Sequence, residues 1–376
     1  MNVEVFVQHL KKMGIDSLIG VPDSTLKVFC DYVNSEGSNV FNHFVPANEG
    51  AAVGLAVGNY LATGRPACVY MQNSGVGNIV NPVTSIAHAD VYDIPMLFLI
   101  GWRGEPGKKD EPQHKFMGRI TESIFDVLEI GHEVIGEETT DEELDAILLK
   151  AAAALKKNRQ YAVIIKKNTF EDRKFSDYAN EHKLVREKAI DTILESLNKD
   201  DVIISTTGKI SREVYEESDR LLGDHKQAFL TVGGMGHASM IALGYAKQRP
   251  DKKVFCIDGD GAVLMHMGSL AFLAKQSPDN MVHICLNNEA HESVGGMPTG
   301  AAGISYAEIA KSCGYPIVNC VTTQEELKLA MDAAKNNNKL TFVEVMVAME
   351  SRADLGRPKE SAVENKENFM EYHGVK

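Results

Sequence analysis

Positive charge is scarce in this chain. Its 376 residues include 39 Lys and Arg against 52 Asp and Glu, which gives a formal net charge of -13. Nucleic acids and anionic membranes are bound through basic faces, so this composition argues against both as partners. A small anionic ligand remains possible, because it needs only local positive charge.

Long apolar runs and paired cysteines are also missing. No apolar run approaches the roughly 18 residues of a membrane span, and the first residues lack the apolar core of a signal peptide. We therefore expect a cytoplasmic protein. The six cysteines include no Cys-x-x-Cys pair and mostly lie in or beside apolar runs, so we expect buried thiols rather than a zinc site or a disulfide framework.

The chain alternates short apolar, β-branched runs with amphipathic stretches. Runs such as "PMLFLIG" and "KVFCIDGD" are typical of buried strands, and "TDEELDAILLKAAAALKKN" is typical of a surface helix. This alternation predicts an α/β fold with parallel sheets covered by helices. The length favours two domains. We place the first at residues 1–170, a polar linker at 171–183 and the second domain at 184–376.

The two halves share a pattern of small residues at one constant offset. The apolar runs "CVYM" and "VFCI" coincide at the same offset, and so do the turns "QNSG" and "DGDG". The coinciding small residues are Gly50 and Gly236, Ala52 and Ala238, Ala56 and Ala242, Gly58 and Gly244, and Gly75 and Gly261. We interpret this as a duplicated α/β unit, with different chemistry at the two turns.

The turn "DGDG" carries the first chemical signal. Asp-Gly after a strand is most often only a turn. An EF-hand is excluded because Ala262 stands where a third Asp or Asn is needed, and a Walker A loop before "TTGKIS" is excluded because Ile203 replaces its first Gly. However, Asn288 ends the next predicted strand, at the sheet edge where Asp260 also lies. Two hard oxygen ligands therefore converge, and the flanking glycines leave room for phosphate, which predicts a metal-diphosphate site.

"GDG" followed about thirty residues later by "NN" resembles the signature of the thiamine diphosphate enzymes. The resemblance implies two related three-layer α/β/α domains, a pyrimidine-binding one followed by a diphosphate-binding one. It also implies that Mg²⁺ is held by Asp260, Asn288 and the backbone oxygen of Ala290. The cofactor contacts implied around this metal are Gly259, Gly261, Ala262, His291 and Ser293.

The same resemblance implies a carboxylate in the first half. In this family a glutamate bonded to the pyrimidine N1′ lets the cofactor's own amino group remove its C2 proton. Glu49 in "VPANEGAA" matches the family's N-E-x-x-A helix start, although a capping glutamate is the alternative reading. Met235 in "GGMGHA" would hold the cofactor in its bent shape, and the Gly233 oxygen would accept its amino group. Asn73 and Ser74, which end a first-half strand, are expected to face the cofactor.

Domain order and length narrow the resemblance to one branch. The carboxylate half precedes the metal half, as in the 2-oxoacid decarboxylases, and the chain has no room for a third central domain. It is similar to the compact phosphonopyruvate and sulfopyruvate decarboxylases. Because the latter typically consist of two separate subunits, the fused chain favours decarboxylation of 3-phosphonopyruvate to phosphonoacetaldehyde and CO₂. Sulfopyruvate decarboxylation and a carboligase reaction are the alternatives.

The resemblance also implies the remaining site residues. Ser24 in "GVPDS" and His114 in "HKFMG" match positions that bind carboxylate or move protons in related decarboxylases. The anionic end of the substrate needs positive groups, for which Lys27, Arg103 and Lys115 are candidates. Val294 replaces an acidic residue of pyruvate decarboxylases, which leaves the final proton donor open. We expect a homo-oligomer with active sites between subunits.

Overall fold

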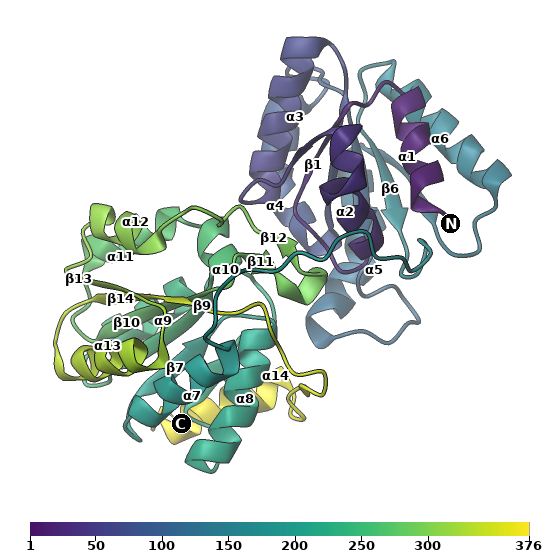
Figure 1. The fold of residues 1–376 in the computed structure, drawn as a ribbon. Helices are drawn as coiled ribbons and strands as arrows, with labels where there is room; N and C mark the ends of the chain where they lie inside the picture. Colours follow the sequence, from purple (N-terminus) through teal and green to yellow (C-terminus); the bar gives the residue numbers. More distant parts are fainter. Residues whose placement is uncertain (376) are drawn as a thin grey trace. The chain divides into compact units, whose positions relative to one another are not determined.

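The computed structural model describes residues 1–375, apart from the side chain of Ser293. The chain divides into two compact units, Met1–Tyr178 and Ala179–Lys376 (Figure 1). The boundary falls inside the 171–183 segment that the sequence predicts as a linker. In the part of the chain that is described, no helix combines the length and the apolar character needed to cross a membrane.

The first unit is built on a six-stranded sheet in which every neighbouring pair is parallel. The strand order is β2-β1-β3-β4-β6-β5. The central strands are buried on both faces, which explains their continuous apolar sequences. The strands are β1 (Ser17–Gly20), β2 (Asn42–Phe44), β3 (Ala67–Gln72), β4 (Met96–Gly101), β5 (Gly131–Ile135) and β6 (Tyr161–Ile165).

Helices cover both faces of this first sheet. On one face α3, α4 and α5 pack against Val69, Phe98 and Ile164. On the other face Phe29 of α2 packs edge-on against Tyr70 of β3. The helices are α1 (Val3–Lys12), α2 (Lys27–Asn34), α3 (Glu49–Thr63), α4 (Val76–Pro82), α5 (Pro112–Val127) and α6 (Asp141–Leu155), with short turns η1 (Glu36–Asn39), η2 (Asn73–Gly75) and the π-helical η3 (Val83–Ala87).

The second unit repeats this plan with a parallel six-stranded sheet of order β13-β14-β10-β9-β7-β8. A small antiparallel pair, β11 (Ala290–His291) and β12 (Met297–Pro298), follows β10. The strands of the main sheet are β7 (Val202–Ser205), β8 (Ala228–Leu230), β9 (Val254–Gly259), β10 (Met281–Asn287), β13 (Ile317–Val321) and β14 (Thr341–Met346).

Eight α-helices are assigned in the described residues of the second unit. The helical segment directly after "DGDG" is broken, since a short α10 ends at Met265 and α11 begins at Gly268. The helices are α7 (Arg186–Ser196), α8 (Lys209–Leu222), α9 (Ala238–Gln248), α10 (Asp260–Met265), α11 (Gly268–Gln276), α12 (Tyr306–Cys313), α13 (Gln324–Asn336) and α14 (Ala362–Tyr372), together with the 3₁₀ turn η4 (Glu292–Val294).

The two sheets have the same topology. Counted in chain order within each unit, both sheets run 2-1-3-4-6-5. The predicted fold class, two related α/β/α domains with parallel sheets, is confirmed, and the described residues contain no third domain between them.

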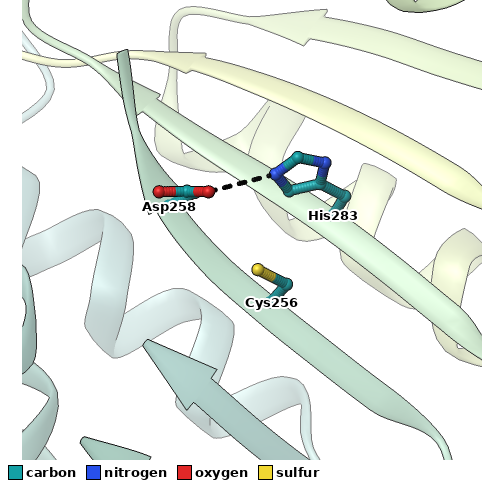
Figure 2. Close-up of side chains that lie close together, drawn as sticks. All are labelled: Cys256, Asp258 and His283. Carbon is teal, nitrogen blue, oxygen red and sulfur yellow. Dashed lines mark ion pairs between the residues drawn. The ribbon is translucent and has the colours of Figure 1, made fainter. Parts of the chain in front are cut away.

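One face of the second sheet combines an apolar core with buried polar groups. Side chains of α9, α11 and α12 pack there against Val254, Cys256 and Phe342. Asp258 and His283 point to this same face, because side chains two residues apart along a strand lie on one side and His283 pairs with Cys256 (Figure 2). Asp258 stands two residues before Asp260, so this polar group is close to the turn that carries Asp260.

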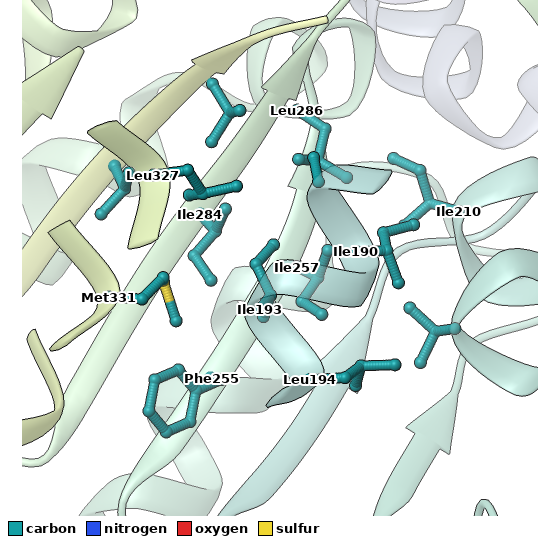
Figure 3. Close-up of a cluster of buried hydrophobic side chains, with 14 of the residues drawn as sticks. Ile190, Ile193, Leu194, Ile210, Phe255, Ile257, Ile284, Leu286, Leu327 and Met331 are labelled. Carbon is teal, nitrogen blue, oxygen red and sulfur yellow. The ribbon is translucent and has the colours of Figure 1, made fainter. Parts of the chain in front are cut away.

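The opposite face of the second sheet is mostly apolar. Phe255 and Ile257 of β9 and Ile284 of β10 meet Ile190 and Leu327 from the covering helices α7 and α13 (Figure 3). Burying such side chains contributes about 1.5–3 kcal/mol each relative to exposing them. This core holds β9 and β10 together, and thus fixes the strand ends from which Asp260 and Asn288 emerge.

Candidate active site

The predicted metal ligands of the second unit come together at one edge of its sheet. Strands β9 and β10 are hydrogen-bonded neighbours, with Leu286 opposite Gly259. Asp260 and Asn288 therefore leave the sheet side by side, and the backbone N–H of Asn288 donates a hydrogen bond to the Asp260 carboxylate. The Thr299 hydroxyl donates a further hydrogen bond of 2.7 Å to Asp260 Oδ2.

The buried Asp260 carboxylate fits a cation. Burial raises the pKa of Asp260 to about 6, although hydrogen bonds from Thr299 and from the N–H groups of Gly261 and Asn288 partly oppose this shift. A carboxylate so placed is stabilised by a positive charge beside it. The carboxylate, the Asn288 amide oxygen and the backbone oxygen of Ala290 are hard donors of the kind Mg²⁺ prefers. The donor set present can hold this ion.

Predicted cofactor-binding residues gather around Gly261. A methyl group added at Gly261 would lie 3.1 Å from Met235 Cε, 3.4 Å from His291 Cε1 and 3.5 Å from Thr299 Cγ2. Burial lowers the pKa of His291 to about 4, so this imidazole is neutral at neutral pH. The structure thus brings Met235, Gly261 and His291 close together after the end of β9, where a methyl group at Gly261 would crowd Met235 Cε.

The other predicted residues of this group lie in the same part of the unit. Gly259 ends β9, and a methyl group there would approach Ile210 Cδ1 to 3.2 Å. Ala262 is buried in α10, and Gly233 is half-buried in the loop between β8 and α9. The predicted contact of Ser293 lies outside the described side chains.

Asp258, which the sequence leaves without a role, is part of a buried polar group (Figure 2). Its Oδ1 accepts the N–H of Gly259 at 3.0 Å, and its Oδ2 lies 3.5 Å from Nε2 of His283. With Cys256 Sγ these ligand-type atoms all lie within 4.8 Å of one another. Asp258 thus restrains the peptide directly before Asp260.

Glu49 of the first unit begins α3. The Asn48 side chain caps this helix by accepting the N–H of Ala51 at 2.9 Å. Glu49 is buried, and its Oε2 accepts a 2.7 Å hydrogen bond from Asn78 Nδ2. A methyl group at Gly75 would lie 2.3 Å from Glu49 Oε1, so the carboxylate rests directly on this glycine. Its position is therefore fixed from two sides.

Arg103 and Ser24 also meet in the first unit. Arg103 donates a hydrogen bond of 3.0 Å to Ser24 Oγ. It also forms a bidentate ion pair with Asp110, whose Oδ2 lies 2.9 Å from Arg103 Nε. Burial opposes ionisation of Asp110, but hydrogen bonds from Arg103 and from the Gly104 and Glu111 N–H groups hold its pKa well below the usual range. Arg103 is thus a fixed positive group.

His114 lies in the first turn of α5, close to this ion pair. A methyl group at Gly104 would lie 2.0 Å from the His114 backbone oxygen, so the 103–104 loop packs against that turn. Burial, and then the charge of Arg103, lower the pKa of His114. Its imidazole is therefore neutral at neutral pH and able to accept a proton.

Two predicted residues of the first unit, Asn73 and Ser74, have side chains that are already hydrogen-bonded within the protein. Asn73 donates to the Arg103 backbone oxygen at 2.8 Å and to Thr121 at 2.9 Å, and accepts the Arg103 N–H at 3.2 Å. A side-chain contact with the cofactor would displace one of these bonds. Ser74 donates to Gln72 at 2.6 Å. Lys27 and Lys115 are exposed and join no described cluster with Arg103.

Sequence reasoning missed the residues that hold the predicted ones in place. These are Asn78 beside Glu49, Asp110 beside Arg103, Thr299 beside Asp260 and Glu292 beside Asn288. Each is an ordinary polar residue in a loop or helix. Two of them, Asn78 and Thr299, end the glycine-containing phrases "GVGN" and "GGMPT". The glycines there were the only local sign of a closely packed side chain nearby.

Family models match both units of the chain. Residues 2–126 match the thiamine pyrophosphate enzyme, N-terminal TPP binding domain, and residues 219–345 match the corresponding C-terminal TPP binding domain. With its paired sheets and its Asp260–Asn288 edge, the chain belongs to the thiamine pyrophosphate enzymes. The prediction that thiamine diphosphate is the cofactor is confirmed.

Relatives define the branch more closely. The chain is 33% identical to "Phosphonopyruvate decarboxylase" of Streptomyces viridochromogenes, over 97% of this chain and 93% of that protein. It is 32% identical to "Phosphonopyruvate decarboxylase" of Streptomyces hygroscopicus, over 96% and 92%. Within the thiamine pyrophosphate enzymes, the chain is therefore a member of the phosphonopyruvate decarboxylase family.

One expectation about the branch needs correction. "Sulfopyruvate decarboxylase" of Methanosarcina acetivorans is 27% identical over 92% of this chain and 90% of that protein. This relative carries both halves in one polypeptide, so a fused chain does not distinguish the two substrates. The preference for phosphonopyruvate depends instead on the higher identity to the two Streptomyces proteins.

Proposed function

We propose that this protein decarboxylates 3-phosphonopyruvate to phosphonoacetaldehyde and CO₂ with Mg²⁺ and thiamine diphosphate. The observation that carries the proposal is the meeting of Asp260 and Asn288 at one sheet edge, in a chain of this family. We assign residues 1–170 to pyrimidine binding, 171–183 to a linker and 184–376 to diphosphate binding.

In the second unit, Asp260, Asn288 and the Ala290 carbonyl would hold Mg²⁺, which binds the diphosphate. Glycines at 259 and 261 leave room for phosphate oxygens, and Met235 supplies an apolar support at Gly261. Bound thiamine diphosphate supplies a positively charged ring that takes up the electron pair left behind when CO₂ departs.

In the first unit, we assign to Glu49 the hydrogen bond with the pyrimidine nitrogen N1′. Asn78 fixes one oxygen of this carboxylate. Arg103, held by Asp110 and Ser24, is a preorganised cation for the anionic substrate. His114, neutral beside it, is a candidate for moving the last proton. Lys27 and Lys115 stay predictions with weaker support, since both are exposed.

We also propose a homo-oligomer with active sites between subunits, since this architecture is implied by the resemblance. The expected cytoplasmic location stays a prediction, which four buried free thiols support: Cys30, Cys68, Cys256 and Cys285.

A coupled assay of aldehyde release from phosphonopyruvate tests the proposed activity, with sulfopyruvate and pyruvate as parallel substrates. We expect the highest kcat/KM with phosphonopyruvate and dependence on both Mg²⁺ and thiamine diphosphate. A higher kcat/KM with sulfopyruvate would establish the second candidate, which the Methanosarcina acetivorans relative supports. No release from either 2-oxoacid would reject decarboxylation of both.

A further inference from the structure

Glu292 lies beside the proposed metal site but has its own set of partners. Its Oε2 accepts a 3.0 Å hydrogen bond from Asn288 Nδ2, and its Oε1 accepts a 2.9 Å bond from Lys209 Nζ. Arg186 Nη1 donates to the same Oε2. The Glu292 side chain is only 10% exposed. A buried carboxylate with two cationic partners and one amide partner is a fixed acceptor.

The partners of Glu292 are themselves anchored on helices. Arg186 begins α7 and uses its other nitrogens to bind Glu213 of α8 at 2.7 and 2.8 Å. Lys209 begins α8 and also donates to Ser351 Oγ at 2.6 Å. Helices α7 and α8 therefore hold the Glu292 carboxylate, and with it the amide of Asn288, in one place. Supports of this kind set the geometry of metal ligands in proteins.

An asparagine side chain has one acceptor end and one donor end, and only the oxygen can bind a cation. With Nδ2 bound to Glu292, Oδ1 is turned to the other side, where it accepts the Ala290 N–H at 3.2 Å. The Asn288 backbone N–H meanwhile contacts the Asp260 carboxylate. If the amide rotated by half a turn, NH₂ would replace the oxygen and repel a cation.

We propose that Glu292 is a positioning residue, which selects the amide orientation of Asn288 that presents Oδ1 to the metal. This inference depends on the proposed metal role of Asp260 and Asn288. It assigns Glu292 no contact with the substrate or the metal, because its oxygens are already taken by Asn288, Arg186 and Lys209.

Mn²⁺ binding, followed by electron paramagnetic resonance with thiamine diphosphate present, tests the proposal on the full chain. Glu292→Ala should weaken Mn²⁺ binding by about 10–100-fold, the usual effect of losing a group that orients a metal ligand. At saturating Mg²⁺, kcat should stay within about threefold of the unaltered protein, since no reacting group is lost. Asp251→Ala is the matched control, because it removes a 2.9 Å ion pair with Arg249 before the start of β9, at the opposite end of this strand from Asp260.

The outcomes separate this inference from the proposed function. Wild-type Mn²⁺ affinity in folded Glu292→Ala protein would overturn the positioning role, while loss of binding in Asp260→Ala would still support the metal site. If the unaltered protein and Asp260→Ala bind Mn²⁺ equally, the proposed metal site itself fails. Should Glu292→Ala not fold, Glu292→Met decides, because it keeps the length of the side chain and offers Asn288 Nδ2 no oxygen acceptor. We expect Mn²⁺ binding to be weakened by at least about fivefold, and unchanged binding rejects the role.

Discussion

The carboxylate of Glu49 occupies a space that a single methyl group would fill. Its Oε1 would lie 2.3 Å from a Cβ at Gly75, far inside van der Waals contact, while its Oε2 is bound to Asn78. Any side chain at position 75 therefore pushes the carboxylate away from its fixed position. Glycine is needed at position 75 to leave space for the carboxylate, and not to permit an unusual backbone conformation.

Gly75→Ala should reduce kcat by about 100-fold, because a displacement of roughly 1 Å at a reacting group has that effect. Gly77→Ala is the matched control, since a methyl group at Gly77 meets nothing within 4 Å and the residue is exposed on α4. Steady-state kinetics at saturating cofactor would check both variants. Equal activity of the two would contradict the assigned role of Glu49, provided circular dichroism shows both to be folded.

How far residues were predictable depends on where their signal lies. Asp260, Asn288 and Glu49 stand in short phrases that resemble motifs of the family, so the sequence alone was enough to propose them as site residues. Asn78 lies 29 positions from Glu49, to which it is hydrogen-bonded. Glu292 is paired with Arg186, which lies 106 positions away. Such pairs depend on strand register and helix packing, which no local pattern encodes.

At the scale of elements, helices α7 and α8 carry a titrating pair remote from the site. Glu217 of α8 shares a hydrogen bond with Asp191 of α7, and Arg220 contacts both. Burial, and then the neighbouring Asp191, raise the pKa of Glu217 from 4.5 to about 7. The pair therefore keeps one proton in the folded protein under conditions in which the unfolded chain has lost it.

Stability should consequently fall as the pH rises through this range. Below pH 4.5 Glu217 is protonated in both states; between 4.5 and about 7 only the folded state holds the proton, so folding is progressively disfavoured. We expect a loss on the order of 1 kcal/mol, reduced by solvent screening around the half-exposed Arg220. Urea unfolding across this window would measure it, and Glu217→Gln should flatten the slope; an unchanged slope in that variant would assign the effect to other groups.

The order of elements was the most predictable level of structure. Alternating apolar and amphipathic stretches predicted parallel sheets, because buried parallel strands have continuous apolar sequences. The break between α10 and α11 could not be predicted, because Met267 and the apolar residues around it carry no signal for a helix end. The small β11–β12 pair was also missed, since two-residue strands have no periodicity to detect.

At the scale of the whole molecule, the shared topology of the two units relates the residues proposed for the two halves of the chemistry. Glu49 and Gly75 are separated by the same interval as Met235 and Gly261, and each pair occupies the same place in its sheet topology. Glu49 rests on Gly75, and Met235 lies over Gly261. The same arrangement, a side chain placed over a glycine, thus holds a carboxylate in the first unit and an apolar side chain in the second.

Glu49 and Asp260 lie in different units of the chain, so the proposed sites between subunits can be tested by mixing two inactive variants. Glu49→Gln and Asp260→Ala should each abolish turnover, because one removes the carboxylate for N1′ and the other a metal ligand. If one site takes Glu49 from one subunit and Asp260 from another, a mixed dimer has one doubly altered site and one intact site. Random exchange at equal concentrations should then restore about a quarter of the normal activity.

If instead each site took both residues from the same chain, every site in a mixed oligomer would carry one lesion and no activity would return. The two variants would be unfolded and refolded together, with each refolded alone and the unaltered protein as controls. Size-exclusion chromatography would show whether oligomers form. Recovered activity that requires co-refolding supports sites shared between subunits, and its absence in well-formed mixed oligomers rejects them.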